Sequence, residues 1–230
     1  MERLTIFIVI LVLIGSCSKY SKEEVNDFLL GGSFLFTTKN QDSIQLEFPA
    51  NCVETYNWNY TIFEQWEISE VIDGIKFYFN GDYFMLSTWK DNEIIFSNKD
   101  IKFKLIKIED EKVNPDSIKG KWIEEIHLPL LSDNIIPPPP CPNFENDTFL
   151  IPSIEFIDGI AINIDFCHER KESYKVNSEF GIISFGESCT ALNQWEVTEL
   201  TKDTMIVNIR HLETSTFKYE ENKTYIRLPH

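Results

Sequence analysis

Residues 75–108 read IKFYFNGDYFMLSTWKDNEIIFSNKDIKFKLIKI, which is four apolar runs separated by three short turns. The last run nearly alternates apolar residues with lysine, as a strand does when only one of its faces is buried. Asn80-Gly81, between the first two runs, is typical of a two-residue hairpin turn. The stretch therefore predicts an antiparallel meander whose lysines face water.

The same kind of pattern extends over the chain on both sides of this meander. Before it, strands are expected at Ser33–Thr38, Ser43–Phe48 and Ile62–Ile72. After it, a second series of strands is expected at Lys121–His127, Phe149–Ile157, Ile160–Phe166, Ser173–Val176, Gly181–Phe185, Gln194–Leu200, Thr204–Arg210 and Thr216–Leu228. We expect a bend in the last strand near Glu220–Asn222, and helix only as a single turn within Val25–Leu30. The chain is predicted to be all-β.

A polar, acidic and proline-bearing segment, residues 109–116, separates the two series of strands. It predicts a domain boundary near residue 113, with a smaller antiparallel β module over 29–112 and a second domain over 113–230. Short sequence echoes link the halves, such as Gln65-Trp66-Glu67 with Gln194-Trp195-Glu196. Either a duplication or the shared chemistry of strands and turns explains them.

The composition excludes several classes of protein. The chain has 230 residues, with 21 Lys and Arg against 37 Asp and Glu, and 43% of its residues are hydrophobic. This apolar content argues against a disordered chain. The net charge of −16 repels phosphate backbones, so no nucleic-acid partner is expected. We find no Gly-x-Ser-x-Gly, His-Glu-x-x-His or phosphate-binding glycine loop, and therefore expect no enzyme, catalytic residue, metal or cofactor.

The N-terminus reads as a removable leader. Leu4–Ile14 is an apolar run of eleven residues, which is too short to span a bilayer but suits a secretory signal peptide over residues 1–16. Ile14-Gly15-Ser16-Cys17 resembles the bacterial lipobox. That resemblance implies that Cys17 becomes the first residue, linked to diacylglycerol and to a further acyl chain such as palmitate. The alternative is a plain signal peptide that happens to end near a cysteine.

Residues 17–28 are expected to form a tether behind this lipid anchor. Within it, Lys22-Glu23-Glu24 resembles the surface-export signal of Bacteroidetes lipoproteins, although an ordinary solvated tether explains the same residues. The membrane is thus an expected partner through the N-terminal lipid, and the bacterial outer membrane the expected location. The periplasmic and cell-surface faces both stay open, and protein partners are unknown.

Residues 117–228 resemble the lipocalin-like domains of many bacterial lipoproteins. The resemblance rests on Gly120-Lys121-Trp122, the Gly-x-Trp of the first lipocalin strand, and on downstream matches that end with 225–228. It implies an eight-stranded up-and-down barrel whose base is closed by Trp122, with an arginine packed on that ring. Arg227 and Arg210 are both candidates for this arginine. In the first module, Gly32-Ser33-Phe34 stands where a Gly-x-Trp would be, so a second barrel there is left open.

The same topology brings three cysteines together. The connections after the first, third, fifth and seventh strands meet at the open mouth of a lipocalin, and they carry Cys141, Cys167 and Cys189. An exported chain keeps disulfides, so we expect at least one bond at this mouth, which includes Cys141 and restrains the loop with the prolines of 137–140. Whether Cys52 forms a disulfide with the remaining cysteine stays open. Zinc binding at Cys167-His168 is the alternative.

Two classes of function fit these expectations. The first is a non-enzymatic binding module that captures a small apolar or amphipathic ligand in the barrel. The second is a structural or interaction lipoprotein in an envelope complex, with a filled barrel and no small ligand. A lumen able to hold a ligand favours the first, and a solid interior the second. An enzyme acting on glycans, with sugars stacked on Trp58, is a weaker third reading.

Overall fold

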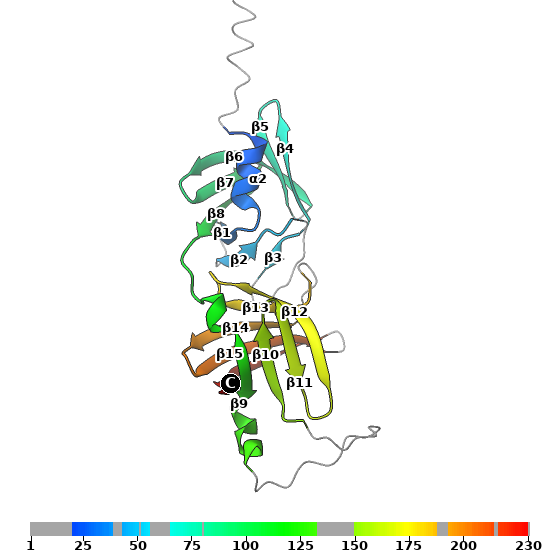
Figure 1. The fold of residues 1–230 in the computed structure, drawn as a ribbon. Helices are drawn as coiled ribbons and strands as arrows, with labels where there is room; N and C mark the ends of the chain where they lie inside the picture. The colour runs from blue at the N-terminus through cyan, green and yellow to red at the C-terminus, as the bar shows by residue number, and fades with distance from the viewer. Residues whose placement is uncertain are drawn as a thin grey trace, which may run out of the picture. The chain divides into compact units, whose positions relative to one another are not determined.

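The fold divides into two compact units, residues 1–108 and 109–230. The computed structural model describes residues 20–38, 43–50, 52–55, 65–79, 81–132, 150–187, 193–213 and 216–229. Both units are antiparallel β structures, as Figure 1 shows, and the predicted all-β class is confirmed.

The described part of the first unit is an eight-stranded sheet with one α-helix. The helix α2 covers Lys22–Leu29. The strands are β1 (Ser33–Thr38), β2 (Ile44–Glu47), β3 (Glu54–Thr55), β4 (Trp66–Val71), β5 (Gly74–Phe79), β6 (Asp82–Lys90), β7 (Glu93–Ser97) and β8 (Lys102–Ile108). They run in the order β3-β2-β1-β8-β7-β6-β5-β4, so β8 returns to pair with β1 while β3 and β4 form the two edges. The first unit is therefore a curled, open sheet.

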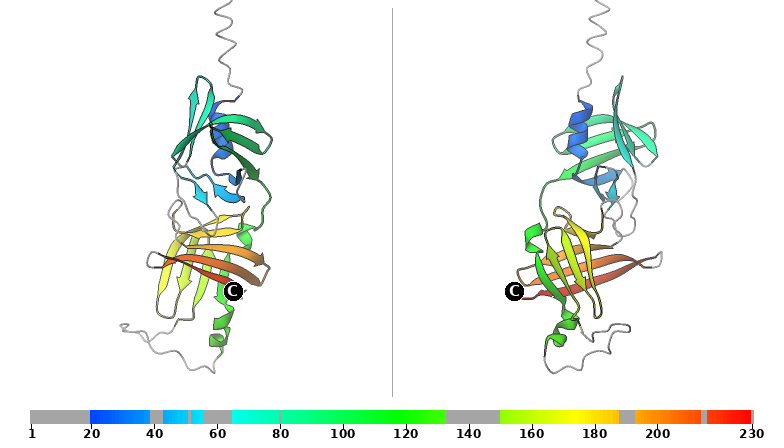
Figure 2. Two further views of the ribbon diagram at one scale, coloured as in Figure 1. Left: turned by 180° about the vertical axis from the view of Figure 1, so that it is seen from behind. Right: turned by 45° about the vertical axis from the view of Figure 1, so that its right-hand side comes forward.

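The core of the first unit is rich in phenylalanine. Phe77 stacks on Phe96 with 4.7 Å between ring centroids, and Phe84 meets Phe103 edge-on at 4.8 Å. Phe77 pairs with Phe84 across β5 and β6, and Phe96 pairs with Phe103 across β7 and β8, so the members of each pair lie on the same face of the sheet. The helix α2 lies against the sheet in both figures and adds Val25 and Leu29 to this core (Figures 1 and 2).

The helix α2 corrects two expectations. A single turn was predicted, but eight residues are helical, because Ser21 and Glu24 form a capping box. Ser21 Oγ accepts the Glu24 amide at 3.1 Å, and the Glu24 carboxylate accepts the Ser21 amide at 2.8 Å. Since Val25 and Leu29 are also fully buried, the predicted tether over 17–28 is wrong for residues 20–28, which belong to the folded unit.

The second unit is a closed barrel in the order β10-β11-β12-β13-β14-β15-β16-β9. Each strand pairs with its neighbour in the chain and β9 closes the ring, which confirms the predicted up-and-down topology. The strands are β9 (Gly120–Glu124), β10 (Ser153–Ile157), β11 (Ile160–Ile164), β12 (Glu169–Asn177), β13 (Ile182–Phe185), β14 (Asn193–Leu200), β15 (Thr204–Glu213) and β16 (Thr216–Arg227). Two 3-10 helices flank β9, namely η1 (Pro115–Ser117) and η2 (Glu125–Leu131).

Two local features refine the predicted strands. The first strand of the barrel stops at Glu124 rather than at His127, and the chain continues as η2. The bend expected in the last strand is confirmed, because the β15–β16 register shifts between Val207 and Ile209 and Asn222 has a φ of 55°. Glu221 and Asn222 of β16 thus stand opposite the single residue Asn208 of β15, which is a β-bulge.

Candidate functional site

The closed end of the barrel is built around Trp122. Its side chain is fully buried, and its indole N–H donates to the carbonyl of Ile118 at 2.7 Å. The guanidinium of Arg227 lies 4.1 Å from the centre of the indole ring, a cation–π distance. Of the two candidate arginines, Arg227 is therefore the one on Trp122. Arg210 lies over Phe217 instead, at 4.0 Å, and donates to Gln194.

Arg227 also ties three backbone segments together at this end. Its Nε donates to the carbonyl of Lys202 and its Nη2 to that of Ser117, both at 2.6 Å, and its Nη1 donates to Lys119. Gly120 has a φ of 117°, and a Cβ there would stand 2.8 Å from Nη1 of Arg227. Glycine is required at position 120 for both reasons, backbone conformation and space.

Aromatic rings fill the lumen above this base. Trp195 lies at the centre, with 4.9 Å between its ring centroid and that of Tyr225, 5.2 Å to Phe185 and 6.1 Å to Phe156. Tyr174 adds an edge contact on Phe156 at 5.0 Å. We call these five side chains the aromatic floor. Because the rings contact one another, this half of the lumen is a packed core.

Charged side chains replace the rings toward the mouth. Residues directly opposite each other in paired strands point to the same side. Glu124 pairs with Tyr225, a floor residue, so Glu124 also faces the lumen. Lys223 is two residues from Tyr225 on β16 and faces the same way. The β-bulge then brings Glu220 opposite Ile209, which belongs to the core.

These groups form one ion-pair network. Lys223 Nζ lies 2.8 Å from Glu124 Oε1 and 2.9 Å from Glu220 Oε2. His211 Nδ1 is 3.9 Å from Glu220 Oε1. Their side chains are 21–41% exposed, so each pair is partly desolvated and still open to solvent.

Strand β12 adds two further charged side chains to the lumen face. Glu172 pairs with the core residue Ala161, and Arg170 pairs with Asn163, so both face the lumen. Burial raises the pKa of the Glu172 carboxyl, and the charge of Arg170 opposes that shift. We define the charged ring as the lumen-facing groups of Glu124, Arg170, Glu172, His211, Glu220 and Lys223.

The floor and the ring meet at the Tyr225 hydroxyl. Burial raises the pKa of Tyr225 above its ordinary range, and the carboxylates of Glu124 and Glu220 add to the shift. The pKa of Lys223 is raised chiefly by its hydrogen bond to Glu124 and then by that to Glu220. At neutral pH, Tyr225 therefore presents a protonated hydroxyl and Lys223 a full positive charge.

This arrangement offers hydrogen bonds and charges of both signs above an apolar base. Charges of both signs can pair with a polar or zwitterionic group. Within the described residues, no group of three or more His, Cys, Asp and Glu side chains could hold a metal ion. The charged ring escaped the sequence analysis because its members are spread over four strands and depend on the bulge.

The predicted mouth cysteines are only partly placed. Cys167 lies between β11 and β12, where its amide and that of His168 donate to Asp165 Oδ1 at 2.7 Å each. The amide of Cys167 is the main cause of the lowered pKa of Asp165. Cys52 and Cys167 each take part in a disulfide. Cys17, Cys141 and Cys189 lie outside the described residues. The lipidation of Cys17 therefore stays a prediction, and so do the pairing of Cys141 and Cys189 and the restraint of the proline-rich loop.

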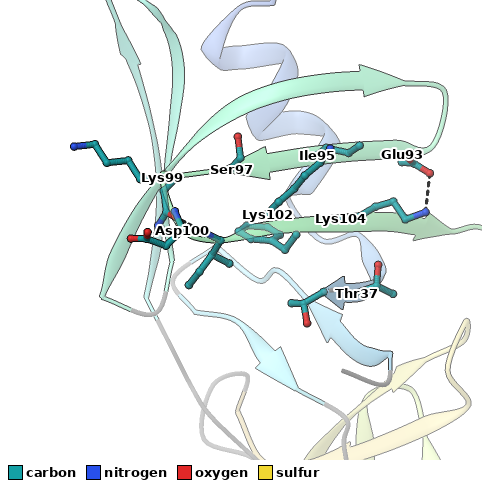
Figure 3. A pocket seen from close by; sticks show the side chains of 12 residues that line it. Thr37, Glu93, Ile95, Ser97, Lys99, Asp100, Lys102 and Lys104 are labelled. Atoms are coloured by element: carbon teal, nitrogen blue, oxygen red, sulfur yellow. Dashed lines mark hydrogen bonds and ion pairs between the residues drawn. The ribbon is translucent and has the colours of Figure 1, made fainter. Parts of the chain in front are cut away.

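Two surface hollows lie outside the lumen. The larger, of about 960 Å³, is an open groove beside β7 and β8 of the first unit (Figure 3). Its ion pair, Lys104 with Glu93 at 3.1 Å, is more than a third exposed and contributes little to stability. The smaller, of about 610 Å³, lies against Arg227 and Lys202 at the closed end of the barrel. Neither is lined by a buried polar side chain that would fix a ligand.

Comparison of the chain with known proteins identifies no relative. No family model, no curated protein and no solved structure matches the chain. In the part of the chain that the structure describes, no helix has the length and apolar character needed to cross a membrane.

Proposed function

We propose that the protein is an envelope lipoprotein, anchored in the bacterial outer membrane through Cys17, whose barrel binds a small amphipathic molecule without converting it. The observation that carries the binding role is the division of the lumen into the aromatic floor and the charged ring. A barrel that served only as a scaffold would have no need of partly desolvated charges above its core, because placing them there costs free energy.

The chemistry of the lumen narrows the ligand class. Because the rings of the floor contact one another, a wholly apolar ligand finds little space below the charged ring. Lys223 and Arg170 can pair with an anionic group, and Glu124, Glu172 and Glu220 with a cationic one. The ligand is therefore an amphiphile with a polar or zwitterionic headgroup and a short apolar part.

Native mass spectrometry tests this role on full-length protein purified from the membranes of its own host. We expect a noncovalent adduct on the wild type and its loss, or about tenfold weaker retention, in Lys223→Met, because one charge-assisted hydrogen bond is removed. Lys171→Met is the matched control, since Lys171 is exposed and pairs with Ile162 on the outer face of β11 and β12. Equal adducts in the two variants would contradict a site at the charged ring.

The anchor is tested separately. Cells fed an alkyne fatty acid are expected to label the wild type and a Ser18→Ala variant, and to leave Cys17→Ala unlabelled, because the thioether can form only at the cysteine. Membrane flotation should follow the label, since several acyl chains give stable anchoring. Labelling of Cys17→Ala at the wild-type level would contradict the lipoprotein proposal. Proteolysis of intact cells separates a surface location from a periplasmic one.

A structural or interaction role is the second candidate. It is favoured by the close packing of Phe156, Phe185 and Trp195, which leaves the lower lumen solid. In that case the barrel would present its loops to an envelope partner. Wild-type protein that carries only its covalent lipid, with no noncovalent adduct, would overturn the binding proposal and support this alternative.

A further inference from the structure

A cluster of aromatic side chains lies immediately after the proposed lipid anchor. The Tyr20 hydroxyl donates to the backbone carbonyl of Trp89 at 2.8 Å, and the two ring centroids are 5.3 Å apart. Phe28 packs on Trp89 at 4.9 Å and on Phe34 of the core at 5.4 Å. Tyr20 is thus fastened to the body of the first unit through Trp89 and Phe28. We call Tyr20, Phe28 and Trp89 the aromatic latch.

The capping box fixes Ser21, the residue after Tyr20, to the start of α2. Ser21 and Glu24 exchange two hydrogen bonds at the start of α2, and the Ser21 amide is the main cause of the lowered pKa of Glu24. Folded structure therefore reaches back to Tyr20, and only Ser18 and Lys19 stand between Tyr20 and Cys17.

Chain length then limits how far the folded unit can stand from the membrane. Three Cα–Cα steps of about 3.8 Å each give a reach of at most about 11 Å from Cys17 to Tyr20. The polar headgroup layer on each side of a bilayer is roughly 5–8 Å thick. An acylated Cys17 lies at the inner border of that layer, so Tyr20 must lie within the layer or a few ångströms beyond it.

From this reach and the latch, we propose that the first unit docks directly on the lipid bilayer, with Tyr20 and Trp89 in the headgroup layer. The inference rests on the proposed acylation of Cys17. Tyr and Trp prefer this layer because each has an apolar ring and a polar group. Trp89 is half-buried, and its indole N–H donates to the carbonyl of Asp91 at 3.3 Å, so part of the ring is free to contact lipid.

The charges around the latch argue for docking that does not depend on anionic lipid. Lys22 and Lys90 are exposed there, but so are Glu23, Glu24 and Asp91, and the mixture has no strong positive field. Lys107 adds one further cation, with its Nζ 5.1 Å from the centre of the Phe28 ring. The covalent anchor and the aromatic rings are therefore sufficient to dock the first unit on a zwitterionic bilayer.

Fluorescence quenching by lipid tests the docking. Acylated full-length protein is reconstituted in phosphatidylcholine vesicles, with or without bromine on the acyl carbons next to the headgroup. We expect brominated lipid to quench the tryptophan fluorescence of the wild type. Most of that quenching should be absent in Trp89→Phe. Trp66→Phe is the matched control, because Trp66 packs on Phe48 and donates to Pro49; it should keep the quenching of the wild type.

A second variant leaves the latch intact and changes only the reach. Insertion of about twelve Gly and Ser residues between Lys19 and Tyr20 adds a flexible span of roughly 20 Å. The variant should still float with the vesicles but lose the Trp89 quenching. Equal quenching of vesicle-bound wild type and Trp89→Phe would overturn the docking while leaving the anchor intact. Protein that carries no acyl mass on Cys17 and does not float would overturn the anchor and the docking together.

Discussion

Replacement of Trp122 by alanine is expected to lower the free energy of unfolding of the barrel by about 3–5 kcal/mol, as for other large side chains truncated in a core. Trp122 has no exposed surface, and it belongs to the core cluster of the barrel. The substitution also leaves the Ile118 carbonyl without its indole donor and removes the ring under Arg227. These losses add to the cavity, which places the effect toward the upper end of the range.

Hydrogen exchange of the full-length protein measures this effect on the barrel alone, since peptides from β9 to β16 report the opening of the barrel strands. Tyr219→Ala serves as the control, because Tyr219 is in the same barrel but 48% exposed; a change below about 1 kcal/mol is expected there. A loss for Trp122→Ala no larger than that of the control would show that Trp122 does not hold the base.

The strands were predictable because their signal is local. In β8, Phe103 and Leu105 are buried while Lys102 is exposed, so the alternation visible in the sequence is the alternation of the two faces. The turn at Gly81 lies between Phe79 and Asp82, which pair across the hairpin. The two-residue strand β3 was missed because Glu54–Thr55 is too short to show any period.

The helix α2 was missed for a different reason. Its eight residues carry only a narrow apolar stripe, and Val25 and Leu29 fix the helix only after they are packed into the core of the first unit. The capping pair Ser21 and Glu24 has the spacing of a capping box and was a usable signal. The acids were instead interpreted as part of a tether, because they follow a cysteine that resembles a lipidation site.

The charged ring could not be derived from the sequence. After the bulge, the alternation of lumen-facing residues along β16 shifts by one position. Tyr225 and Lys223 therefore share the lumen face with Glu220 rather than with Glu221. A shift of one residue moves every following side chain to the opposite face of the strand. The sequence TFKYEENKTY does not show where that shift occurs. The partners of Lys223 also come from distant parts of the chain, since Glu124 is 99 residues away.

The two units share a plan that their sequences barely reveal. In each, a helical segment comes before the first strand, and the first strand pairs with the last. A glycine stands just before β1 (Gly32) and at the first position of β9 (Gly120). Phe34, fully buried, pairs with Lys107, as Trp122 pairs with Arg227. The likeness ends at the register, because the Lys107 ammonium lies over Phe28 and not over Phe34, whereas Arg227 lies over Trp122 itself.

A second large effect is expected for Arg227. Replacement by methionine should lower the free energy of unfolding of the barrel by about 2–4 kcal/mol, because it removes the cation over Trp122 and three charged hydrogen bonds. Those bonds join Ser117 and Lys119, before β9, to Lys202, between β14 and β15. Without the guanidinium, the carbonyls of Ser117, Lys119 and Lys202 lose these donors and would have to turn to water.

Arg227→Lys separates the guanidinium geometry from its charge. The lysine keeps a positive charge near the ring but cannot reach three carbonyls in one plane, so we expect it to recover less than half of the loss caused by methionine. Arg170→Met, which removes an exposed arginine at the mouth, should change the stability by less than about 1 kcal/mol. Exchange in β9 and β16 should rise first in the Arg227 variants, because Arg227 pairs with Trp122 across those two strands. Full stability in Arg227→Lys would mean that charge alone closes the base, and the planar contacts to Ser117, Lys119 and Lys202 would then have no role in holding the barrel shut.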